Sequence, residues 1–162
     1  MKLDPLAFLA NPDLLLALKK RSIEVACSGE YYLFRQGEPP VGLFILNKGE
    51  VTLSMNSPSG GQLLSMQVGA GSLLGLPGLI SNEPYTLTAL ACSGAELSFV
   101  TPENFRALMQ TEPGLALKVL EVLAAEVRSA RHATQELRPM DPLAISDNDA
   151  TQPTSRLTSD LN

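Results

Sequence analysis

Hydrophobic and polar positions divide the chain into three zones, of which the first is a short helix. In "NPDLLLALKKRS" the residues Leu14, Leu15 and Leu18 fall on one face at helical spacing. Asn11 suits the N-cap and Pro12 the first helical position. The pattern predicts an amphipathic helix that packs on the segment after it.

Short apolar runs broken by Gly, Pro and Asn follow from Ile23 to Val100: "IEVAC", "YYLFRQGEPP", "VGLFILNKGEVTLSM", "QLLSMQV", "YTLTALA" and "AELSFV". Strands of about five residues with turn signals every 8 to 12 or so are typical of a sandwich or barrel. Asn47–Glu50 and Ser57–Gln62 suit hairpin turns, since Asn and Gly accept positive φ angles. We predict a mainly β fold with flanking helices, a jelly-roll-like antiparallel β-roll.

The third zone is helical. Thr101 and Pro102 begin a short helix, and a long helix follows from "TEPGLALKVLEV". Apolar positions in it alternate by four and three, as in a coiled-coil seam: Ala116, Leu120, Leu123, Val127, Ala130, Thr134 and Leu137. A second row, Leu115, Val119 and Val122, is predicted to pack on the β-roll. Core packing explains the first half of the seam, whereas Leu120, Leu123, Val127 and Ala130 are predicted to form a homodimer interface.

After Leu137 the sequence "RPMDPLAISDNDATQPTSRLTSDLN" has no sustained apolar periodicity. Such a segment buries too little surface to offset the entropy of ordering it. We therefore predict one domain over residues 8–136 and a disordered tail over residues 137–162.

Charge and composition limit the possible partners. A formal net charge of −5 removes the usual electrostatic basis for binding nucleic acid or an anionic membrane surface. Polar residues and prolines interrupt the N-terminus, and no apolar run approaches the roughly 20 residues that span a bilayer. We expect a soluble cytoplasmic protein. Cys27 and Cys92 lie far apart without a CxxC partner, which favours buried free thiols.

Catalysis is not expected. A cupin-type metal enzyme also has a β-roll, but its site needs several His and carboxylate ligands, and His132 is the only histidine. The sequence offers no partners that would make His132 a haem or metal ligand, so we interpret it as an exposed helix residue. No catalytic residue and no metal site are predicted.

The order of these elements resembles the cyclic nucleotide-binding domain of the catabolite-activator (Crp/Fnr) superfamily over about residues 8–131. The resemblance rests on "LFRQGEPPVGLFILNKGEVTLSM", on the loop "GAGSLLGLPGLISNEPYTLTALA" and on "LSFVTPENFRALMQTEPGLALKVLEVLAAEVRSAR". Its most specific positions are Phe34, Gly37, Glu38, Gly49–Val51, Gly71, Gly75 and the run Leu97–Phe105. No helix-turn-helix is expected in so short a C-terminal segment.

The resemblance implies that the glycine-bearing loop is a phosphate-binding cassette. In ligand-binding members a short helix presents backbone N–H groups to the cyclic phosphate, a Glu binds the ribose, and an Arg pairs with the phosphate. Here Leu76 occupies the Glu position and Tyr85 the Arg position, while Thr86 keeps a hydroxyl and Pro77 and Gly78 alter the cassette helix. The charged contacts of a cyclic nucleotide are therefore lost, and no cofactor is predicted with certainty.

The resemblance assigns the effector site to six residues, which are Gly75, Leu76, Pro77, Tyr85, Thr86 and Arg128. Leu73, Leu74, Leu76 and Leu79 are alternatively interpreted as apolar filling of an empty pocket. Arg35 and Arg106 are candidates for a substitute cation or for a solvated surface role. Arg128, Ser129 and Arg131 lie where family members contact the base, or else take part in salt bridges across the dimer with Glu126.

Two functions remain open from the sequence. The first is a regulatory sensor domain that binds a small effector and signals through its dimer helix to an unknown protein partner. The second is a ligand-free dimerising scaffold that keeps only the fold. A pocket with bound density, or a thermal shift on a panel of metabolites, favours the first function, and an occluded apolar pocket favours the second.

Overall fold

A computed structural model describes residues 1–136, and the predicted tail and Leu137 of the seam lie outside the described residues. The helices are η1 (Pro5–Phe8, a 3-10 turn), α1 (Pro12–Lys19), α2 (Leu76–Ser81), α3 (Pro102–Thr111) and α4 (Gly114–Glu136). The strands are β1 (Ile23–Ala26), β2 (Tyr31–Phe34), β3 (Leu43–Lys48), β4 (Val51–Asn56), β5 (Gln62–Val68), β6 (Leu73–Leu74), β7 (Thr88–Ala91) and β8 (Glu96–Val100).

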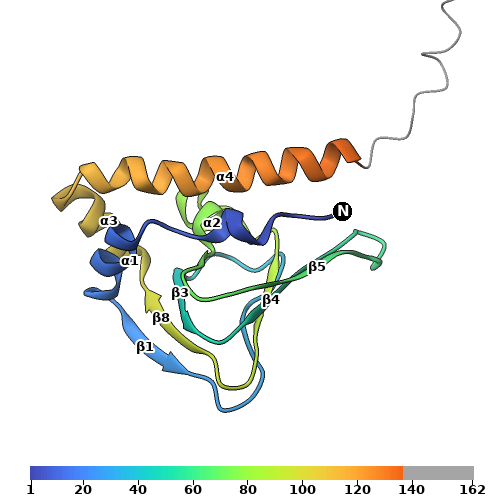
Figure 1. The fold of residues 1–162 in the computed structure, drawn as a ribbon, viewed down its shortest axis with the longest axis horizontal. Helices are drawn as coiled ribbons and strands as arrows, with labels where there is room; N and C mark the ends of the chain where they lie inside the picture. Colours follow the sequence, from blue (N-terminus) through green and yellow to red (C-terminus); the bar gives the residue numbers. More distant parts are fainter. Residues whose placement is uncertain (137–162) are drawn as a thin grey trace, which may run out of the picture.

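The strands form two four-stranded antiparallel sheets, in the orders β1-β8-β3-β6 and β2-β7-β4-β5 (Figure 1). The predicted hairpin turn at Ser57–Gln62 is confirmed, because it joins the antiparallel neighbours β4 and β5. The prediction of a hairpin at Asn47–Glu50 is wrong, because this turn joins β3 to β4, which lie in different sheets. The two antiparallel sheets confirm the predicted β-roll with flanking helices.

Strand β3 is buried on both faces and separates two apolar cores. Leu43 and Ile45 pack with the helices, whereas Phe44 and Leu46 pack between the sheets. Side chains alternate across a strand, so the continuous run "LFIL" supplies both cores at once. This arrangement places the helices on one side of the roll.

The helices begin where the caps predict. The side chain of Asn11 accepts a hydrogen bond from the Asp13 N–H at 2.8 Å, and that of Thr101 accepts from the Asn104 N–H at 3.2 Å. Val119 and Val122 of α4 are buried against the roll, which confirms the second row of apolar positions.

Helix α4 runs across one side of the molecule, past α1, α2 and η1 (Figure 1). Lys118 forms an ion pair with Asp13 of α1 at 3.0 Å, and the Asp4 N–H donates to Ser129 Oγ at 2.7 Å. Contacts with both the N-terminal segment and α1 therefore fix α4 over the β-roll. None of the helices in the described part meets the length and hydropathy that a membrane span requires.

Candidate effector-binding site

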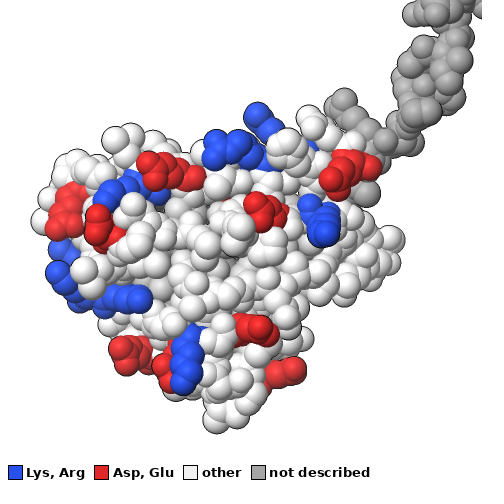
Figure 2. Space-filling model, viewed as in Figure 1, with Lys and Arg blue, Asp and Glu red and all other residues white. Residues whose placement is uncertain are grey.

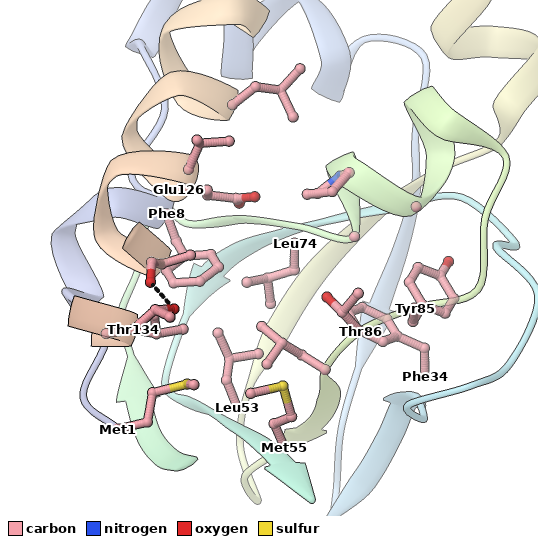
Figure 3. A pocket seen from close by; sticks show the side chains of 18 residues that line it. Met1, Phe8, Phe34, Leu53, Met55, Leu74, Tyr85, Thr86, Glu126 and Thr134 are labelled. Carbon is pink, nitrogen blue, oxygen red and sulfur yellow. Dashed lines mark hydrogen bonds between the residues drawn. The ribbon is translucent and has the colours of Figure 1, made fainter. Parts of the chain in front are cut away.

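A cavity of about 420 Å³ lies between the β-roll, α2 and α4 (Figure 3). Most of its wall is apolar: Phe34 from β2, Leu53 and Met55 from β4, and Leu74 from β6. The remaining lining residues are Met1, Leu3, Phe8, Gly75, Pro77, Gly78, Tyr85, Thr86, Leu87, Leu123, Glu126, Val127, Ala130 and Thr134. Ligand pockets of small-molecule sites have this size and this apolar character.

Gly75 shapes the edge of the cavity where α2 begins. Its φ of 89° lies in the left-handed region, and a Cβ there would lie 3.1 Å from the Gly42 carbonyl oxygen and 3.2 Å from the Tyr85 ring. Any residue with a side chain would therefore suffer both a steric clash and an unfavourable left-handed backbone conformation at this position. The backbone at Gly75 therefore packs closely against Gly42 and Tyr85, in agreement with the glycine that the cassette motif has at this position.

Tyr85 is part of that wall. Its ring stacks on Phe34 with centroids 4.0 Å apart, and the side chain is only 4% exposed. The hydroxyl accepts from the N–H groups of Val41 at 2.8 Å and Gly42 at 3.3 Å, and it donates to the Gly42 carbonyl at 3.0 Å. These bonds commit the phenol to the backbone, so its ring rather than its hydroxyl is available to a ligand.

The structure brings together four of the six residues assigned to the effector site. Gly75, Pro77, Tyr85 and Thr86 line the cavity, and Thr86 turns its hydroxyl toward it (Figure 3). Leu76 is fully buried in the helix-side core instead, in the cluster with Val100 and Phe105. The prediction that Leu76 faces a ligand is wrong, because the first turn of α2 directs its side chain between β3 and the helices.

Arg128 also lies outside the cavity. It borders a neighbouring hollow with Lys2, Asp4 and His132, on a different face of α4 from Val127. Successive helical residues point about 100° apart, so the two positions face different surroundings. His132 is exposed, as expected.

The interpretation of the cassette leucines as pocket filling holds only for Leu74, which lines the cavity. Leu73, Leu76 and Leu79 belong to the core beneath α1, α3 and α4. Leu73 and Leu74 point to opposite sides because they are successive residues of β6. These buried side chains stabilise the roll and leave the cavity open.

The candidate substitute cations do not reach the cavity. Arg35 stacks over the ring of Tyr32, with its guanidinium carbon 4.2 Å from the ring centroid, and Arg106 is exposed on α3. Charged side chains of both signs are scattered over the face in Figure 2. No Lys or Arg contributes to the lining of the cavity in residues 1–136.

Glu126 is the cavity residue that the sequence reasoning missed. Its carboxylate points into the cavity from α4 (Figure 3), and its Oε1 is buried without a hydrogen-bond partner in the described structure. Burial raises the pKa of this carboxyl to about 8. The expectation of a salt bridge from Glu126 across a dimer is not supported by this inward position.

A sequence signal for Glu126 exists in the spacing of the buried row. Val119, Val122, Ser129 and Ala133 are buried, and Glu126 falls four residues after Val122 and three before Ser129. An acidic residue spaced three or four positions from buried residues of the same helix lies on their face, and so it faces the interior even though it is charged.

In the described residues, no group of three or more His, Cys, Asp or Glu side chains is placed to hold a metal ion. Cys27 is a buried free thiol and burial raises its pKa, while Cys92 is a half-buried free thiol. The prediction of buried free thiols is thus confirmed fully for Cys27 and partly for Cys92.

Comparison with known proteins gives the family. A family model of the cyclic nucleotide-binding domain matches residues 25–112. A candidate potassium channel protein of Rhodopseudomonas palustris is 26% identical over 124 residues, which cover 76% of this chain and 28% of that protein. The chain thus spans little more than a quarter of that relative.

Solved structures agree in fold. The catabolite activator protein of Thermus thermophilus superposes with a TM-score of 0.69 at 22% identity, over 83% of this chain and 63% of that one. The sensor domain of the transcriptional regulator DNR from Pseudomonas aeruginosa gives 0.58 at 23% identity, over 81% and 86% of the two chains. With the family model covering more than half of its residues, this chain belongs to the cyclic nucleotide-binding domain family and has the β-roll of the Crp/Fnr regulators.

Proposed function

We propose that the protein is a regulatory sensor domain that binds a small, mostly apolar effector in the cavity and signals through α4. The observation that carries the proposal is the open cavity of about 420 Å³ beside the loop that the family resemblance identifies as the phosphate-binding cassette. A scaffold that kept only the fold gains stability when such a space is filled by side chains. An open cavity therefore supports binding over a purely structural role.

The effector is proposed to be something other than cyclic AMP or cyclic GMP. The cyclic phosphate of either nucleotide is an anion, and the lining described in residues 1–136 offers it no Lys or Arg side chain. The buried Glu126 carboxyl would repel it when ionised. A ligand with a large apolar surface instead gains from Phe34, Leu53 and Leu74.

Signalling is proposed to pass through a homodimer. Leu120 is 57% exposed and Val127 is 49% exposed, although both belong to the predicted seam on α4, and Ala130 is also exposed. Leu123, Val127, Ala130 and Thr134 serve both as seam positions and as cavity lining. A ligand that moves these side chains changes the surface offered to a second α4, so binding and assembly are linked.

Native mass spectrometry of protein purified without denaturation tests the proposal. We expect a small molecule to accompany the wild-type protein and an Ala124→Trp variant, since Ala124 is exposed on α4 and does not line the cavity. The Ala130→Trp variant, which places a large ring at the cavity, should lose it. Two results together contradict the proposal: no co-purified molecule, and no thermal shift of the wild-type protein on a panel of metabolites. The cytoplasmic location expected from the sequence stays a prediction.

A further inference from the structure

The Glu126 carboxyl has a position that the fold itself does not explain. Its Oε1 has no solvent contact and no hydrogen-bond partner, and the surrounding wall is formed by residues such as Phe8, Leu74 and Val127. Buried polar atoms in folded proteins nearly always have a partner. A ligand in the cavity can supply the missing donor.

In residues 1–136 no cationic group lies within ion-pair distance of this carboxyl. The N-terminal segment contributes Met1, Leu3 and Phe8, β2 contributes Phe34, and β4 contributes Leu53 and Met55. β6, α2 and the segment before β7 contribute Leu74, Gly75, Pro77, Gly78, Tyr85, Thr86 and Leu87, and α4 adds Leu123, Val127, Ala130 and Thr134. The one other ionisable side chain among them is the phenol of Tyr85, which is bonded to Val41 and Gly42.

The other charged side chains near this part of α4 belong to another surface. Lys2, Asp4, Arg128 and His132 border the neighbouring hollow, whereas Met1, which carries the α-amino group, lines the cavity itself. Within the described part of the chain, residues 1–136, this amino group forms no ion pair with Glu126. Thr134 donates its hydroxyl hydrogen bond to the Ala130 carbonyl at 2.8 Å. Glu126 is thus the single acidic group of the cavity and the natural anchor for a ligand.

We propose that the effector is an organic cation: a mostly apolar molecule carrying one amine, whose ammonium group pairs with the Glu126 carboxylate while its apolar part fills the cavity. This inference rests on the proposed function and names its ligand class. A neutral apolar ligand leaves Oε1 without a donor, and an anionic ligand adds a second negative group beside it. An ammonium supplies both the donor and the opposite charge.

Proton release accompanies this binding. Burial raises the pKa of Glu126 to about 8, so most of the free protein holds a neutral carboxyl at pH 7. The ammonium of the ligand favours the ionised carboxylate, and the proton of Glu126 passes to the buffer. Affinity should therefore rise by up to about tenfold per pH unit between pH 6 and 8, and then level off.

Three probes of nearly equal shape test the inference: 4-phenylbutylamine, 4-phenylbutan-1-ol and 4-phenylbutanoic acid. Two-dimensional amide NMR at pH 7.5 measures the dissociation constant of each and locates it through the shifts of Leu74, Thr86 and Val127. For the amine we expect about 0.1–1 mM, from typical gains per ligand atom, and at least about tenfold weaker binding of the alcohol and the acid.

Glu126→Gln should weaken the amine about tenfold or more, leave the alcohol unchanged and abolish the pH dependence. Glu121→Gln is the matched control, because Glu121 is exposed on the same helix and does not line the cavity. It should leave all three probes unchanged.

The inference is overturned if the alcohol or the acid binds as tightly as the amine at the cavity residues, and in that case the proposed function survives. It is also overturned if Glu126→Gln leaves amine binding unchanged, or if none of the probes shifts these amides at 5 mM or so. The proposed function fails on different evidence, namely the absence of both a co-purified molecule and any thermal shift.

Discussion

Two polar side chains at the cavity, Tyr85 and Glu126, show how a single residue's partners decide its role. The Tyr85 hydroxyl satisfies three backbone groups of Val41 and Gly42 and thereby belongs to the scaffold. The Glu126 Oε1 satisfies none, and it is held in place by the burial of its neighbours on α4. The phenol thus stabilises the fold, whereas the carboxyl destabilises it and remains available to bind.

The stability of the ligand-free protein should fall as pH rises from about 5 to 8. The Glu126 carboxyl has a pKa near its ordinary 4.5 in the unfolded chain and about 8 in the folded protein, so only the unfolded state ionises in this window. The resulting loss in the free energy of unfolding over this pH range is about 5 kcal/mol at most. Thermal melts at several pH values should show a steep decline for the wild type and for Glu121→Gln. The decline should be clearly smaller in Glu126→Gln, and an equal slope in that variant contradicts the assignment.

Removing one oxygen from Tyr85 should destabilise the fold. Tyr85→Phe leaves the N–H of Gly42 and its carbonyl buried without the phenol, and we expect a loss of about 1–3 kcal/mol in the free energy of unfolding. Tyr31→Phe serves as control, because Tyr31 is 56% exposed. Urea denaturation of both variants measures the difference, and equal midpoints would show that the hydroxyl bonds contribute nothing.

At the scale of single elements, the cassette helix α2 depends on its first backbone angle. Gly75 precedes the six residues of α2 with a φ of 89°, and Gly94 has a similar φ of 87° but open space around it. Alanine substitutions at these two glycines therefore separate the energetic cost of a positive φ from the cost of a steric contact.

Gly94→Ala should lower the free energy of unfolding by about 1–2 kcal/mol, the usual cost of a left-handed alanine. Gly75→Ala should cost at least about 1 kcal/mol more, because its Cβ would lie 3.1 Å from the Gly42 carbonyl oxygen and 3.2 Å from the Tyr85 ring. Urea denaturation compares them directly. Similar losses in both variants would mean that the cassette relaxes away from Gly42.

The sequence predicts the elements well because each has a local signal. Asn11, Thr101 and the hairpin glycines fix where helices and turns begin, and "LFIL" is apolar on both faces because β3 is central. The site was harder to predict. Whether Leu76 faces a ligand or the core depends on the angle at which α2 meets the roll, and no local pattern records that angle.

For the whole molecule, we expect a dimer at micromolar concentration in light scattering. Leu120→Glu should weaken it at least about tenfold, since a twofold interface brings two copies of the new charge into the seam. Leu16→Glu is the control, because Leu16 is 58% exposed on α1 and lies outside the seam. A wild-type monomer at high concentration contradicts the dimer.

Selectivity against cyclic nucleotides is also a property of the whole cavity. Calorimetry with cyclic AMP and cyclic GMP should show no binding tighter than about 100 μM, because the charged pairs of the family are missing. Restoring them as Leu76→Glu and Tyr85→Arg should unfold or destabilise the protein before it binds, since both side chains are buried. Tight wild-type binding overturns this expectation.

Tyr85 also constrains how such a chain changes over generations. The phenol at this position is bonded to Val41 and Gly42 and stacked on Phe34. A mutation to arginine removes those contacts and buries an unpaired guanidinium, so it lowers fitness through folding before any phosphate is bound. Descendants of this chain are therefore expected to keep Tyr85 and to vary cavity residues whose side chains are less tightly bonded.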